Sequence, residues 1–99
     1  MTAPHFRATL RIAADHPALP GHFPGRPVVP GVVLLDGVVA ALERWRGQRV
    51  RGFPQVKFAR PLLPEQDAEI VLEDSASGGL RFRISCAAAT IASGSIEAA

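Results

Sequence analysis

Two side chains stand out by type and surroundings as candidates for acid–base chemistry, His22 and Asp36. His22 lies in a loop rich in proline and glycine, and Asp36 lies in the otherwise uncharged run 32–42. A neutral histidine is a suitable general base near pH 7. An aspartate among apolar neighbours is favoured in its protonated form, so it can serve as an acid. Such a pair could act as a general base and a general acid.

A helix is predicted to follow the histidine loop and to carry Asp36. Pro30 and Gly31 mark its start, because proline is tolerated where the N–H it lacks would have no intrahelical partner. The helix runs to Arg46, and Gly47 can close it in a left-handed cap. Its eleven residues 32–42 are apolar on almost every side, which is typical of a buried helix, and a membrane span would need about 20. We therefore expect the rest of the chain to wrap this helix, with Gly37 leaving room for a close neighbour.

The loop and the helix start match a known pattern. Residues 22–32 read His-Phe-Pro-Gly-Arg-Pro-Val-Val-Pro-Gly-Val. This segment resembles the active-site signature of the FabA/FabZ-type 3-hydroxyacyl-acyl carrier protein dehydratases, whose acidic residue follows fourteen residues after the histidine, as Asp36 does here. Residues 57–64, Lys-Phe-Ala-Arg-Pro-Leu-Leu-Pro, resemble the family's second motif, a strand and a turn. The likeness covers about residues 9–97, and the short chain looks most like the compact dehydratases of the aryl-polyene type.

Three positions depart from the family pattern. Val29 stands where the family usually has methionine, and Glu65 stands where it usually has glycine. Ala40 replaces a glutamine four residues after the acid. The last change removes a polar neighbour of Asp36, so it bears on activity more than on fold.

The resemblance implies a role for each candidate residue. His22 would remove the proton at C2 of a 3-hydroxyacyl thioester, and Asp36 would protonate the leaving hydroxyl at C3 or orient a water there. The backbone N–H of Gly31 would hold the thioester oxygen at the helix start, where the N–H is unpaired and the helix dipole is positive. One such donor contributes about 3 kcal/mol to the barrier. The remaining substrate-binding candidates are Phe23, Gly25 and Phe58.

The rest of the chain reads as antiparallel strands. Alternating apolar and polar residues predict strands at 6–14, 68–73, 80–84 and 90–97, and another within 48–60 that is interrupted at Pro54. Residues 75–79 form a polar turn, whereas 87–89 contain no turn residue although a turn is needed there. One helix against such a run of strands fits the α+β hotdog fold of the family, in which a curved antiparallel sheet wraps a long central helix. We expect one domain over residues 1–99 and an edge-to-edge dimer with histidine and acid from different subunits.

Composition excludes several other classes of function. The net charge is only +2, and the sequence lacks the alternating basic and aromatic residues that are typical of nucleic acid binding. Three scattered histidines and the single Cys86 have no metal-ligand spacing, and no cofactor motif is present. Residues 1–14 lack the apolar core of a signal peptide, so we expect a cytoplasmic protein without a membrane span.

We therefore expect a dehydratase that acts on an acyl carrier protein substrate, as a homodimer or a heterodimer, in fatty acid, aryl polyene or polyketide-like synthesis. Two alternatives stay open: a hotdog thioesterase in which Asp36 activates water, and a non-catalytic subunit that binds the carrier. The cations available to an acidic carrier are Arg44, Arg46, Arg49, Arg51 and Arg60.

Overall fold

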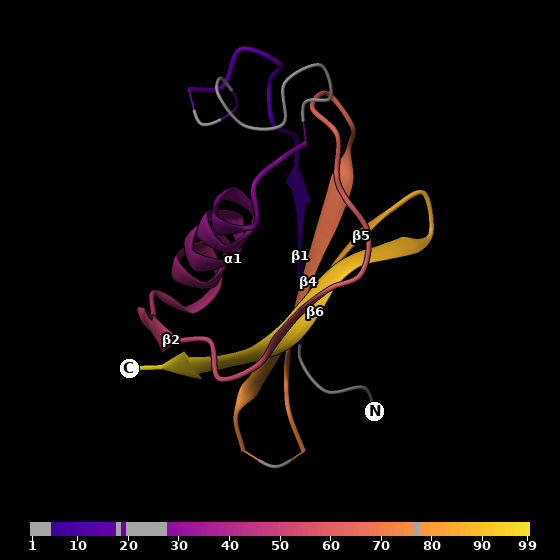
Figure 1. The fold of residues 1–99 in the computed structure, drawn as a ribbon. Coiled ribbons are helices and arrows are strands. Elements are labelled where there is room, and N and C mark those ends of the chain that lie inside the picture. The colour runs from indigo at the N-terminus through magenta and orange to yellow at the C-terminus, as the bar shows by residue number, and fades with distance from the viewer. Residues whose placement is uncertain (1–4, 18, 20–27, 77) are drawn as a thin grey trace.

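The computed structural model describes residues 5–17, 19, 28–76 and 78–99 of the 99-residue chain. One helix lies on the concave side of a strongly curved antiparallel sheet (Figure 1). The elements in chain order are β1 (His5–Leu10), α1 (Gly31–Arg46), β2 (Val50–Gly52), β3 (Val56–Phe58), β4 (Ala68–Asp74), β5 (Leu80–Cys86) and β6 (Ala89–Ala98). The predicted α+β arrangement and the helix bounds are confirmed.

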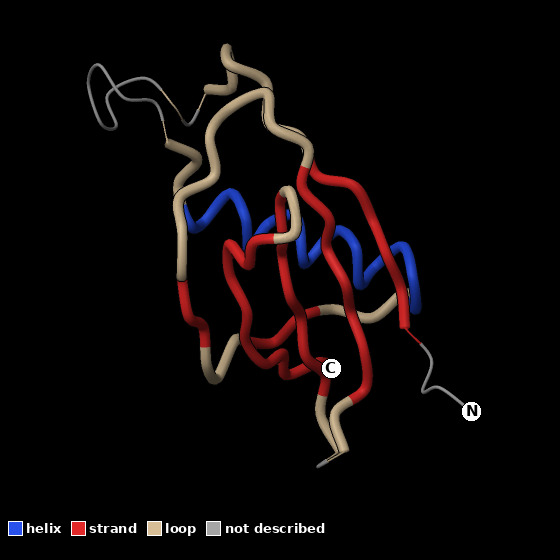
Figure 2. Tube along the Cα trace, turned by 90° about the vertical axis from the view of Figure 1, so that its right-hand side faces the viewer, coloured by secondary structure: helices blue, strands red, loops and turns tan. Residues whose placement is uncertain are grey.

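The sheet runs in the order β1-β4-β5-β6, and both β2 and β3 pair with the free edge of β6 (Figure 2). Pro54 lies between β2 and β3, which confirms the predicted interruption, because proline has no N–H to donate to a ladder. Strand β1 ends at Leu10, earlier than the predicted 14. Leu10 pairs with Ala68, the first residue of β4, so the chain beyond Leu10 has no strand to pair with.

Side chains alternate along the central strands, with one face of the sheet packed on the helix. The inward residues of β4 and β5 are almost fully buried, whereas Arg81 and Arg83 between them are exposed. This alternation is the period-2 pattern on which the strand prediction was based. The largest side chains of the core that are fully buried are Val38, Leu42, Leu62, Ile70, Leu72 and Ile84.

Gly37 lets the helix approach the sheet closely. A Cβ at this position would lie 3.1 Å from Leu10 Cδ1 of β1 and 3.3 Å from Ile70 Cδ1 of β4. Both distances are tighter than ordinary packing, so these two side chains would have to shift by a few tenths of an ångström to admit even an alanine. The prediction that Gly37 makes room for a neighbour is confirmed, and the neighbours are these two core side chains.

The opposite face of α1 is open. Val32 is 63% exposed, and Asp36 and Ala40, four and eight residues further along, are also exposed. Residues four apart lie on one side of a helix, so they form a continuous stripe that the sheet does not reach. The expectation that the chain wraps the helix on every side is wrong for a single chain, because the sheet covers only the side of α1 that faces β1 and β4.

The C-terminal end of α1 is held by a cap and by a charge pair. Gly47 adopts φ 65° and donates its N–H to Glu43 O at 2.8 Å, as predicted for a left-handed cap. Arg46 donates two hydrogen bonds to Asp74 at the end of β4, at 2.9 and 2.6 Å. These bonds hold the pKa of the Asp74 carboxyl below its ordinary value and raise the pKa of Arg46. Arg46 also lies 3.8 Å over the ring of Trp45.

The turn between β5 and β6 uses two alanines. Ala87 and Ala88 have φ values of 50° and 68°, in the left-handed region that alanine seldom adopts. Hairpins of this kind usually take asparagine and glycine there. The sequence therefore carried no signal for this turn, and β6 begins at Ala89, one residue before the predicted start.

Candidate functional site

The predicted site residues fall into two groups. His22, Phe23 and Gly25 lie outside the described residues. Gly31, Asp36 and Phe58 are described, and the structure brings Gly31 and Phe58 together while Asp36 points elsewhere. The described part of the candidate site therefore lies at the start of α1 and the end of β3.

The start of α1 presents a backbone N–H, that of Gly31, to which no described residue is hydrogen-bonded. Pro30 is the N-cap residue, with extended φ and ψ of −60° and 146° and no capping side chain. The N–H groups of Val33 and Leu34 both turn back to Pro30 O, at 3.0 and 3.4 Å. The N–H of Gly31 has no partner among the described residues. No acidic residue occupies the first turn, so the positive end of the helix dipole is uncompensated there by α1's own side chains.

The end of β3 is fixed beside this helix start. The N–H of Val29 donates to Leu62 O at 2.8 Å, which ties the segment before the helix to the segment after β3. Ala59 N–H donates to Ile91 O at 2.8 Å and so holds the end of β3 against β6. Two separate backbone bonds thus set the distance between Gly31 and Phe58.

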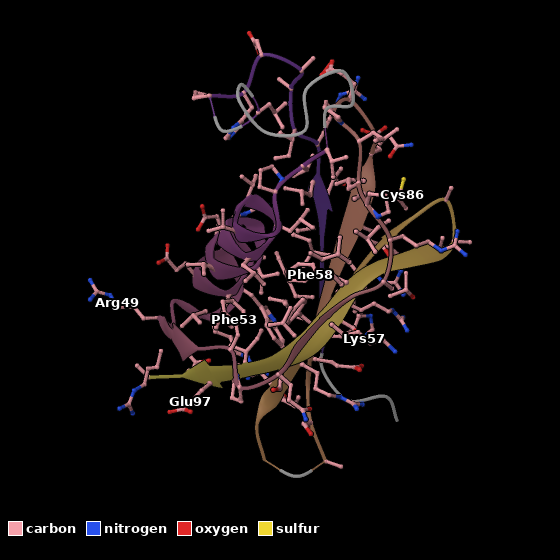
Figure 3. All side chains as sticks on the ribbon, in the orientation of Figure 1. Arg49, Phe53, Lys57, Phe58, Cys86 and Glu97 are labelled. Atoms are coloured by element: carbon pink, nitrogen blue, oxygen red, sulfur yellow. The ribbon has the colours of Figure 1, made fainter. Side chains whose placement is uncertain are left out.

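Gly31 and the ring of Phe58 are in close contact. A Cβ at Gly31 would lie 2.7 Å from Phe58 Cζ and 3.0 Å from Cε1, which no side chain could occupy without moving the ring. Figure 3 shows Phe58 on the helix side of the sheet and its neighbour Lys57 on the outer side. Phe58 is 52% exposed, so part of its ring remains available to a ligand.

An apolar pocket of about 330 Å³ opens at this contact. Both Gly31 and Phe58 line it, and Arg60 is the one charged residue among the described residues that do so. The sequence predicted Gly31 and Phe58 as site residues. Leu62 lines the pocket as well, and the Pro-Val-Val-Pro run before the helix was the available signal for the rest of the wall. The remaining lining residues are Val28, Val29, Pro30, Leu34, Ala59 and Pro61.

Asp36 does not face the pocket of its own chain. It lies five residues after Gly31, which turns it by roughly 140° around the helix axis and moves it about 7.5 Å along it. Its side chain belongs to the exposed stripe with Val32 and Ala40. The expected desolvation of Asp36 is therefore wrong within one chain, because the carboxyl lies on the uncovered face of the helix.

Two further findings bear on the class of site. Among the described residues, no group of three or more histidine, cysteine or acidic side chains could hold a metal ion. Across the same residues, no helix is long and apolar enough to cross a bilayer.

Comparison with known proteins gives the class and then the family. The fold matches the crystal structure of an uncharacterised protein from Erwinia carotovora subsp. atroseptica with a TM-score of 0.80. The two sequences are 28% identical, and the match covers 96% of this chain and 82% of the Erwinia chain. A dehydratase heterocomplex, ApeI:P from Xenorhabdus doucetiae, matches with a TM-score of 0.78 at 24% identity, over 99% of this chain and 98% of its own. The hotdog fold is thereby confirmed.

The sequence matches place the chain among dehydratases. The family model for ApeI-like proteins, described as ApeI dehydratase, matches residues 2–95. The 3-hydroxyacyl-acyl carrier protein dehydratase FabZ of Klebsiella pneumoniae subsp. pneumoniae is 29% identical in an alignment 90 positions long, which covers 78% of this chain and 60% of that relative. The chain thus spans less than two thirds of the length of this relative. The chain belongs to the ApeI-like dehydratase family.

Proposed function

We propose that the protein is a 3-hydroxyacyl-acyl carrier protein dehydratase, which eliminates water from a 3-hydroxyacyl thioester to give a trans-2-enoyl thioester. The observation that carries the proposal is the N–H of Gly31, which has no partner in the described part of the chain, at the wall of an apolar pocket in a protein of a dehydratase family. The pocket offers apolar contact for the acyl chain, and the N–H offers a hydrogen bond to the thioester oxygen.

The reaction needs a base, an acid and a charge stabiliser. His22 takes the proton from C2, and the electrons of that C–H bond form the C2–C3 double bond. The C3–O bond breaks, and Asp36 gives its proton to the departing hydroxyl, which leaves as water. Negative charge that builds on the thioester oxygen is stabilised by the N–H of Gly31, helped by the positive end of the helix dipole. No electron acceptor or cofactor is required for this step.

The position of Asp36 supports a site shared between two subunits. The carboxyl lies roughly 140° around the helix from Gly31, on a stripe that includes the 63%-exposed Val32. A second hotdog subunit covering this stripe would desolvate Asp36 and bring it to the partner's pocket, where it would act with the partner's own His22 and Gly31. We propose a dimer, either a homodimer or a heterodimer with a related subunit, and we place it in the cytoplasm.

The test is to incubate the purified protein with 3-hydroxyacyl-acyl carrier protein substrates and to measure the mass of the attached acyl group. Wild type should lose the mass of one water, and His22→Ala and Asp36→Asn should not. Glu43→Gln, which removes an exposed carboxylate from the same helix, and His5→Ala, which removes an exposed histidine from β1, are the matched controls and should stay active.

A mixing experiment tests the shared site. If the histidine and the acid come from different subunits, a dimer of one His22→Ala chain and one Asp36→Asn chain has one intact site and one doubly damaged site. Random mixing of the two inactive chains should then restore about a quarter of the wild-type activity. A site contained within one chain would give no restoration, and this result would contradict the proposed dimer arrangement.

Other outcomes identify the competing functions. Release of free thiol with the acyl group intact would identify a thioesterase in which Asp36 activates water. Binding of acyl carrier protein without turnover, across several acyl chain lengths, would identify a non-catalytic subunit. Ala40 favours this second alternative, because an exposed alanine stands on the Asp36 stripe where the family usually has a glutamine.

A further inference from the structure

Arg60 has an unusual position at the pocket beside Gly31. It is the one charged residue among the described residues that line this pocket, and the other lining residues are apolar or glycine and proline. Its backbone is fixed, because its N–H donates to Ile91 O of β6 at 3.2 Å. The residue is exposed, and a long arginine can cover apolar surface with its stem while its guanidinium stays in water. Arg60 therefore adds the one positive charge that the described residues bring to the wall of this apolar pocket.

The guanidinium of Arg60 has no ion-pair partner among the described residues. Several other arginines of the sheet, the helix and the segment after β1 form ion pairs at short distance. The pairs are Arg7 with Glu69 at 3.1 Å, Arg11 with Asp67 at 3.0 Å and Arg46 with Asp74 at 2.6 Å. An unpaired guanidinium is a planar fork of donors whose shape matches a phosphate or a carboxylate.

Three features of the pocket indicate which chemical groups its ligand should carry. Apolar walls suit a hydrocarbon chain, the N–H of Gly31 suits a carbonyl oxygen, and the exposed Arg60 suits an anion. We propose that Arg60 binds the 4′-phosphate of a phosphopantetheine-linked thioester, an inference that rests on the proposed function. In such a substrate the acyl chain, the thioester carbonyl and the phosphate follow one another in this order. Arg60 is then a specificity residue that does not touch the reacting atoms.

The test compares two thioesters that carry the same 3-hydroxyacyl chain, one on phosphopantetheine and one on pantetheine. Wild type should prefer the phosphorylated substrate by about tenfold in kcat/KM, which is the size of one charge-assisted hydrogen bond. The preference should lie in KM, because the phosphate does not react. It should also shrink at high ionic strength, since salt screens an exposed charge.

Variants of Arg60 assign the preference to this side chain. Arg60→Ala should bring the ratio of the two kcat/KM values close to one, because it removes the preference for the phosphorylated substrate. Arg60→Lys keeps the charge without the fork and should retain part of the ratio. Arg49→Ala removes an exposed arginine beyond the other end of α1 and should keep the whole ratio. An unchanged ratio in Arg60→Ala, or an equal loss on both substrates, would overturn the proposal.

The failure of this proposal can be told apart from failure of the proposed function. If wild type dehydrates neither thioester, the proposed reaction is wrong, and binding is measured by calorimetry with unreactive acyl thioethers of phosphopantetheine and pantetheine. Tighter binding of the phosphorylated ligand by wild type but not by Arg60→Ala would support the phosphate site by itself. Equal binding of the two ligands by wild type would refute it.

Discussion

The contact between Gly31 and Phe58 predicts that alanine at position 31 is harmful only while the ring is present. The new Cβ would lie 2.7 Å from Phe58 Cζ, well inside the 3.4 Å at which ordinary contact begins, so the ring would have to move by several tenths of an ångström. Overpacking of this kind costs about 1–3 kcal/mol in a core. Because Phe58 is 52% exposed and free to shift outward, we expect the lower end of that range.

A second effect of Gly31→Ala opposes the first. Alanine is a better helix former than glycine by up to about 1 kcal/mol, and by less in a first turn. The single change should therefore reduce the free energy of unfolding by no more than about 1 kcal/mol. In a Phe58→Ala background the clash is absent, and the same change should be neutral or stabilising. The interaction energy between the two positions should be about 1 kcal/mol or more.

The assay is urea unfolding of wild type, both single variants and the double variant. All four proteins are compared at one concentration, because an oligomer links stability to protein concentration. The reasoning would be refuted by an effect of Gly31→Ala that is the same in both backgrounds within about 0.4 kcal/mol, the limit of additivity for independent sites. In that case Phe58 would not pack on the helix start, and the pocket built from this contact would lose its basis.

Three further predictions concern strained or charged positions. Ala88→Gly should raise the free energy of unfolding by up to about 1 kcal/mol, because glycine adopts φ 68° without strain. Ala89→Gly in the neighbouring strand should lower the free energy of unfolding, and urea unfolding of both variants compares the two effects. Glu65→Gly should likewise be stabilising in the same assay, since Glu65 has φ 67°; a loss of stability would show that its side chain matters more than its backbone. Asp74 has a lowered pKa in the folded chain, so its contribution to stability is present above its unfolded pKa of about 3.8 and is lost as pH falls through the lower folded pKa. Arg46→Gln should remove this contribution, which thermal unfolding measured between neutral and acid pH would detect as a smaller pH dependence than in wild type.

Much of the fold could be predicted because its signals are local. Pro30 and Gly47 bound the helix through their own backbone properties, and the structure ends α1 where they indicate. Period-2 alternation located β4 and β5, since each turns one face to the core. The prediction failed where no local signal exists. Ala87 and Ala88 carry no turn preference, and their left-handed backbone is imposed by the pairing of β5 with β6.

The candidate site was only partly predictable for the same reason. The sequence alone determined that Gly31 begins a helix and that Asp36 lies fourteen residues after His22, and both facts depend on spacing along the chain. Only the tertiary structure decided that Phe58, far along the chain, packs on Gly31, because this contact depends on where β3 joins β6. It also decided which face of the helix is covered. Hydrophobicity marks Val32 and Val38 alike, but the sheet reaches only one side of α1, so Val38 is buried and Val32 stays open beside Asp36.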